Sequence, residues 1–146
     1  MGNPKLYRSS NGRPMHYSVG AVIKNELGAY LLIDRLKVPL GYAGIAGHVD
    51  EGELPETALE REVREESGLV VVRSRLLFEE ERPGNVCSRG INTHHWRLYA
   101  CEVSGEIRWN QEETKSIDWY SKKQVRSMRN ELESIWQYWF TKLGVF

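Results

Sequence analysis

The segment from Pro55 to Ser67 constrains the fold of this chain more than any other part of its sequence. Proline suits the first position of a helix, and the following Gly68 suits the residue just past a helix end. Apolar residues recur within the segment at the helical period, at Ala58, Leu59 and Val63. The segment therefore predicts an amphipathic helix that packs one face against a hydrophobic core.

Three carboxylates lie at the edge of the buried face of this helix. Glu62, Glu65 and Glu66 are interleaved with the apolar positions. Glu60, in contrast, falls on the solvent side. Like charges three or four positions apart repel, and partial burial adds a desolvation cost. Arg61 can reach Glu65, but one arginine cannot neutralise three acids. Two interpretations remain: an acidic helix edge held by salt bridges, or a divalent-cation site whose oxygen ligands favour Mg²⁺ or Mn²⁺ over zinc.

The spacing around these acids resembles the Nudix box at every position that the box specifies. It runs from Gly47 to Leu69 and reads GHVDEGELPETALEREVREESGL. Chance agreement at so many fixed positions is very improbable. The resemblance implies an α/β fold, an α/β/α sandwich with a central mixed β-sheet. It also implies hydrolysis of a nucleoside diphosphate linked to another group, with Mg²⁺ as the cofactor and Mn²⁺ as an alternative.

The resemblance also implies a role for the helix acids. Glu62, Glu65 and Glu66 correspond to the metal-binding carboxylates of the family. Gly47 corresponds to the glycine whose backbone carbonyl often joins them. Glu66 is our first candidate for the general base that takes a proton from the attacking water.

Two further box residues are expected to position these acids. Arg61 corresponds to the arginine that pairs with and orients them, and Glu53 to the glutamate that braces the loop against the helix. The chain departs from the family pattern at Leu54, where a Ser or Thr usually caps the helix. Losing that side-chain acceptor removes about 1 kcal/mol.

Candidates for substrate binding lie outside the box. Arg35, at the end of a predicted strand, is a candidate phosphate ligand. Glu112 or Glu113 is a second candidate for the base or an extra metal ligand, with a solvated polar loop as the alternative. Tyr42 and Trp119 are candidates for stacking on a base, or simply core residues.

The rest of the chain predicts strands interleaved with helices in one domain over residues 1–146. The turn signal at 25–28 favours a hairpin between the first two strands. We expect irregular chain over 1–16 and 39–47, strands over 17–23, 30–35, 70–78 and 91–103, and a short apolar stretch over 117–120.

The C-terminal part predicts two helices. Ser121 with Gln124 has the spacing of a capping box, and Asn130 with Glu133 repeats it at the start of an amphipathic helix over 130–146. That helix either packs on the core or forms a homodimer interface, because its apolar residues lie on one face: Leu132, Ile135, Trp136, Trp139, Phe140 and Leu143.

Histidines and cysteines give a weaker signal. Strand alternation sends His94 and Trp96 to one face and His95 to the other, so the adjacent histidines cannot chelate one metal. Cys87 and Cys101 are too few for a structural zinc site or a disulfide framework. They predict reduced thiols in a cytoplasmic protein.

Composition narrows the choice of function. The 146 residues include 20 Lys and Arg and 20 Asp and Glu. This balance disfavours nucleic-acid partners, an RNA decapping enzyme included, since phosphate backbones attract a cationic surplus. No apolar run is long enough to span a membrane, and no secretory signal is evident. The short chain favours a nucleoside triphosphate pyrophosphohydrolase that releases a nucleoside monophosphate and pyrophosphate. An ADP-ribose or nucleotide-sugar pyrophosphatase and a non-catalytic nucleotide-binding regulator are the alternatives.

Overall fold

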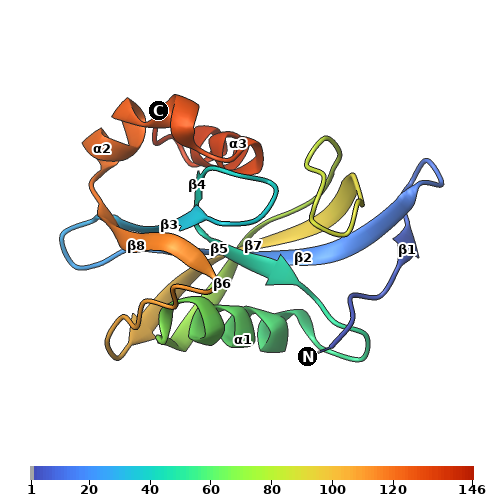
Figure 1. Ribbon diagram of the computed structural model, residues 1–146, viewed down its shortest axis with the longest axis horizontal. Coiled ribbons are helices and arrows are strands. Elements are labelled where there is room, and N and C mark those ends of the chain that lie inside the picture. Colours follow the sequence, from blue (N-terminus) through green and yellow to red (C-terminus); the bar gives the residue numbers. More distant parts are fainter. Residues whose placement is uncertain (1) are drawn as a thin grey trace.

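Helices cover both sides of a layer of strands in the computed structural model, which describes residues 2–146 (Figure 1). Helix α1 (Pro55–Ser67) lies on one side, with the bounds that the sequence predicts. Helices α2 (Lys122–Ser127) and α3 (Ser134–Lys142) lie on the other side. The predicted α/β/α sandwich is confirmed.

The strand layer consists of two sheets. The larger is mixed, because β2 pairs in parallel with β7 and antiparallel with β1 and β5, while β6 pairs antiparallel with the far edge of β7. Its strands are β1 (Tyr7–Arg8), β2 (Pro14–Ile23), β5 (Ile45–His48), β6 (Val70–Arg82) and β7 (Thr93–Ser104). The smaller sheet is antiparallel and contains β4 (Tyr42–Ala43), β3 (Tyr30–Arg35) and β8 (Thr114–Tyr120).

The prediction of a hairpin between the first two strands is wrong, although its turn is present. The turn forms, since the Gly28 amide donates to the Asn25 carbonyl at 3.0 Å, and one bridge joins Lys24 to Tyr30. The two strands then enter different sheets. The edge of β2 that a hairpin partner would use is taken by β5, whose Ile45 pairs with Ala21.

Strands also occupy parts of the chain that we expected to be irregular. β1 and the first residues of β2 lie within 1–16, and β5 lies mostly within 39–47. β6 continues to Arg82 because its polar end pairs with β7, where Arg82 lies opposite His94. Pairing with β3 likewise starts β8 at Thr114. These segments lack an apolar pattern, so the partner strand rather than local propensity decides their conformation.

The C-terminal region packs into the core. Ser121 and Gln124 form the predicted capping box, but α3 begins at Ser134, and Asn130 lies in a 3₁₀ turn (Arg129–Glu131). The apolar face of α3 is at most 4% exposed at Ile135, Trp136, Trp139 and Phe140. This face is therefore not available as a dimer interface. No helix described over 2–146 has the length and apolar character needed to cross a membrane.

Candidate metal and nucleotide site

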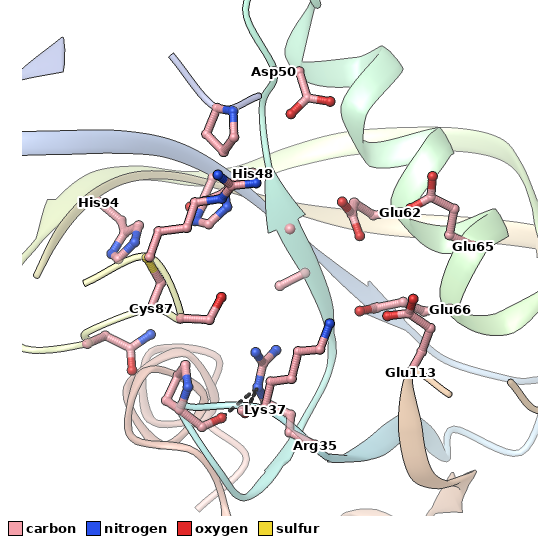
Figure 2. Close-up of a pocket in the computed structure, with 18 of the residues that line it drawn as sticks. Arg35, Lys37, His48, Asp50, Glu62, Glu65, Glu66, Cys87, His94 and Glu113 are labelled. Atoms are coloured by element: carbon pink, nitrogen blue, oxygen red, sulfur yellow. Dashed lines mark hydrogen bonds between the residues drawn. The ribbon is translucent and has the colours of Figure 1, made fainter. Parts of the chain in front are cut away.

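Helix α1 presents its carboxylates to a pocket of about 310 Å³. Ala58, Leu59 and Val63 are buried beneath the helix, which leaves the acids at its edge facing the cavity (Figure 2). Gly68 ends the helix with a φ of 77°, in the left-handed region that favours glycine. No side chain caps the start at Leu54, as expected.

Arg61 is the centre of an ion-pair network at the mouth of this pocket. Its Nε and Nη2 each donate to Glu53 at 2.9 Å, and its Nη1 donates to Glu62 at 2.7 Å. Its Nη2 also donates to the carbonyl of His48 at 2.9 Å. The Arg61 hydrogen bonds hold the pKa of Glu53 below its ordinary value. Glu53 also accepts from the Asp50 amide at 3.0 Å, so it ties the loop to the helix.

The remaining acids carry more negative charge than Arg61 can balance. Burial raises the pKa of Glu62 to about 7, although Arg61 opposes the shift. Burial, followed by the charge of Glu62, raises the pKa of Glu66 well above its ordinary value. The Oε2 atom of Glu66 is buried and has no hydrogen-bond partner among residues 2–146. Glu65 is half exposed, with its carboxylate 3.5 Å from Arg61.

This arrangement fits a divalent cation. The buried, unpartnered oxygen of Glu66 and the mutual repulsion with Glu62 would both be relieved by a bound cation. The backbone at Gly47 lies so close to Glu62 that a Cβ there would overlap the Glu62 carboxylate. The Gly47 backbone is therefore beside the acids. The residues present can hold Mg²⁺, whereas salt bridges alone leave Glu66 uncompensated.

Glu62 makes the stability of the metal-free chain depend on pH. Because its pKa is raised above the ordinary value, the folded state binds more protons than the unfolded state between about pH 4.5 and 7. The stability due to this group is complete below that range and is lost as the pH rises through it. We expect urea denaturation with EDTA to show the free energy of unfolding falling by on the order of 2 kcal/mol from about pH 5 to 8, relative to Glu62→Gln.

The comparison with Glu62→Gln cancels the contribution of three histidines in and beside the pocket. Burial lowers the pKa values of His16, His48 and His94, so these residues destabilise the fold on acidification, opposite to Glu62. Saturating Mg²⁺ is expected to reduce the loss at high pH, since a cation binds the ionised acid. The raised pKa of Glu62 is contradicted if the free energy of unfolding of wild type, relative to Glu62→Gln, does not change with pH or increases with pH.

Only some of the candidate substrate-binding residues line the pocket in the structure. Arg35 lines the pocket, with its Nε donating to the Pro39 carbonyl at 2.6 Å. Glu113 also lines the pocket and its charge contributes to the raised pKa of Glu66. Glu112 lies instead in a separate depression of the surface. Tyr42 and Trp119 do not line the pocket described over 2–146.

Several pocket residues escaped the sequence analysis. Glu133 was expected to cap a helix with Asn130, but it is buried, lies 3.5 Å from Arg35 and accepts from Asn85 Nδ2 at 3.0 Å. Burial raises its pKa. Lys37 and His48 also line the cavity. The one sequence signal for His48 is its position directly after the box glycine, where β5 continues.

The chain combines an α/β/α sandwich with a carboxylate-bearing helix at the edge of a polar pocket. Together these two features indicate its protein family. Residues 14–140 match the family model of the NUDIX domain. The chain belongs to the NUDIX family, which confirms the resemblance found in the sequence.

Known proteins similar to this chain agree with that assignment. An 8-oxo-dGTP diphosphatase from Haemophilus influenzae is 39% identical over 74 residues, covering 46% of this chain and 53% of that protein. The chain thus spans about half the length of that relative. The solved MutT protein from Methanosarcina mazei shares the fold with a TM-score of 0.74 and 21% identity, over 89% of this chain and 93% of that one. A MutT NUDIX hydrolase from Burkholderia pseudomallei has a TM-score of 0.66 and 26% identity, over 75% and 85%.

Proposed function

We propose that this chain is a Mg²⁺-dependent nucleoside triphosphate pyrophosphohydrolase, which releases a nucleoside monophosphate and pyrophosphate. The observation that carries the proposal is the division of charge across one pocket. Glu62, Glu66 and Glu113 lie on one side of the pocket, and Arg35 and Lys37 extend toward it from the β3 end (Figure 2). A chain of phosphates needs a cation on one side and basic side chains on the other.

Mg²⁺ would be held by Glu62, Glu65 and Glu66, with the carbonyl of Gly47 beside them. A bound ion of this kind neutralises phosphate oxygens and lowers the pKa of the attacking water. Mn²⁺, which prefers the same oxygen ligands, is expected to substitute. The Arg61 bridge to Glu53 fixes the orientation of Glu62.

Glu66 is the proposed general base. Its carboxylate lines the pocket, and one of its oxygens is buried without a hydrogen-bond partner among residues 2–146. Water attacks phosphorus, the bond to the bridging oxygen breaks, and the proton of the water passes to the carboxylate. Glu113, which faces the same cavity, is the second candidate. Arg35 and Lys37 are proposed to hold the charge of the terminal phosphates.

The partial match to an 8-oxo-dGTP diphosphatase makes 8-oxo-dGTP the first substrate to assay. The test is a product assay with and without Mg²⁺ or Mn²⁺ on 8-oxo-dGTP, the common NTPs and dNTPs, ADP-ribose and nucleotide sugars. We expect metal-dependent release of a nucleoside monophosphate together with pyrophosphate.

The other outcomes each overturn part of the proposal. Release of orthophosphate instead of pyrophosphate would show that a different phosphate bond is cleaved. Turnover of only ADP-ribose or a nucleotide sugar would contradict a nucleoside triphosphate as the substrate. No turnover with either ion, combined with nucleotide binding by calorimetry, identifies a non-catalytic regulator.

A further inference from the structure

Three histidines and a cysteine meet beside the pocket, away from the carboxylates, and His48, Cys87 and His94 line its wall. One ligand atom from each of His16, His48, Cys87 and His94 lies within 4.8 Å of all the others. Figure 2 shows His48, His94 and Cys87 together on the side opposite Glu62 and Glu66. None of these four side chains has a role in the proposed hydrolysis.

The sheet brings the histidines together from three strands. His16 on β2 and His94 on β7 are direct partners in a parallel register. His48 lies on the other neighbour of β2, opposite Ser18, which is two residues from His16 and so on the same face. Their rings are close: the centroids of His16 and His48 are 4.7 Å apart, and those of His48 and His94 are 5.7 Å apart.

Cys87 reaches this cluster from the loop between β6 and β7. The loop turns tightly there, with the Cys87 amide donating to Ile91 at 3.1 Å and the Gly90 amide donating to Cys87 at 2.9 Å. The turn holds Sγ 3.9 Å from Nδ1 of His16.

The cluster has the character of a ligand set rather than of a packed core. His16 and His94 are at most 5% exposed, yet the Nδ1 atom of His94 has no hydrogen-bond partner in the described chain, residues 2–146. Burial lowers the pKa of His94 to about 4, so its imidazole is neutral and its nitrogen lone pair is available. A buried polar atom with no partner needs an explanation, and a coordinated ion supplies one.

We propose that His16, His48, Cys87 and His94 bind a borderline-soft divalent transition-metal ion, of which Zn²⁺ is the representative. Tetrahedral zinc places its nitrogen and sulfur ligands roughly 3.3–3.8 Å apart. The ligand atoms here need to close by at most about 1.5 Å to reach that geometry. Nitrogen and thiolate ligands disfavour Mg²⁺, so this site is chemically distinct from the oxygen ligands of α1.

Four protein ligands make the site closed, which is the pattern of structural zinc. Its effect is to fasten the loop that carries Cys87 to the sheet. The same loop carries Asn85, which donates to Glu133 on the pocket wall. The cysteine count predicts no structural zinc site. That prediction does not apply to this cluster, because three histidines complete the ligand set and only one cysteine is needed.

Cobalt spectroscopy tests the site without any measurement of hydrolysis. The chelator-stripped, reduced chain is titrated with Co²⁺ in excess Mg²⁺, which occupies the carboxylates. We expect one Co²⁺ per chain, intense visible bands of tetrahedral cobalt and a thiolate-to-cobalt charge-transfer band, all lost when Zn²⁺ displaces Co²⁺. A weak octahedral spectrum without the charge-transfer band, or no binding, overturns the proposal.

Matched variants assign the ligands. Cys87→Ser, which is nearly isosteric in a loop, is expected to lose the charge-transfer band and bind on the order of 100-fold more weakly, since even an outer partner is worth 10–100-fold. Cys101→Ala, at the other cysteine, and His95→Gln, on the opposite strand face, are expected to keep the wild-type spectrum. The proposal is wrong if Cys87→Ser keeps the band or if Cys101→Ala loses it.

Thermal unfolding provides the second readout. Zn²⁺ is expected to raise the Tm of the wild type and of Cys101→Ala, because it binds only the folded ligand set. The Tm of Cys87→Ser is expected to respond much less. An equal rise in wild type and Cys87→Ser places the zinc elsewhere and overturns the assignment.

Discussion

Glu66→Gln is expected to lower kcat for Mg²⁺-dependent nucleoside triphosphate hydrolysis by about 10²–10⁴-fold. The variant is expected to remain folded and to be more stable than wild type when no metal is present. Kinetics of pyrophosphate release measure the first effect, and thermal unfolding in EDTA measures the second.

The two effects have one physical cause, the buried charge of Glu66. Its carboxylate has a buried oxygen without a partner in residues 2–146 and faces the negative charge of Glu62. Glutamine keeps the shape but removes the charge, so the repulsion and the desolvation cost disappear from the metal-free fold. The same change removes the proposed anionic ligand and proton acceptor of the hydrolysis.

Glu60→Gln is the matched control on the same helix. Glu60 is exposed on the solvent face of α1, and its loss is expected to leave kcat and Tm near wild type. If Glu60→Gln and Glu66→Gln reduced kcat equally, the general charge of the helix rather than the pocket would be responsible.

The contrast between Glu60 and Glu66 shows why the helix was predictable. The apolar period, Pro55 and Gly68 fix the bounds of α1 and the face it buries, because all of these signals are local. The Nudix spacing adds the loop before it. The hairpin prediction is wrong because β2 pairs with β5 and β7. The residues that decide this pairing are distant from β2 in the sequence.

The opposite wall of the pocket was not predictable for the same reason. His94, Asn85 and Glu133 come from a strand, a loop and a helix cap that only the fold brings together. Strand alternation correctly separated His94 from His95, but it gave no sign that His16 would lie beside His94. Between Glu112 and Glu113 the sequence could not choose, because the choice depends on how the loop before β8 turns.

Gly47→Ala is expected to reduce kcat/KM by at least about 100-fold while changing the free energy of unfolding by less than about 1 kcal/mol. A Cβ at this position would overlap the Cγ, Cδ and Oε1 atoms of Glu62. Glu62 is a flexible side chain and can swing away, so the fold tolerates the methyl group. Its carboxylate then leaves the position fixed by the 2.7 Å hydrogen bond from Arg61, and the proposed metal ligand is misplaced.

A double-mutant cycle separates this mechanism from a general disturbance of β5. Glu62→Gln already removes the ligand that Gly47→Ala is expected to displace, so the double variant should be no less active than Glu62→Gln alone. Both residues then act through one carboxylate, and their individual losses do not add. Additive losses would show instead that the methyl group damages the pairing of Gly47 with Val19, and Gly47 would have no part in placing Glu62.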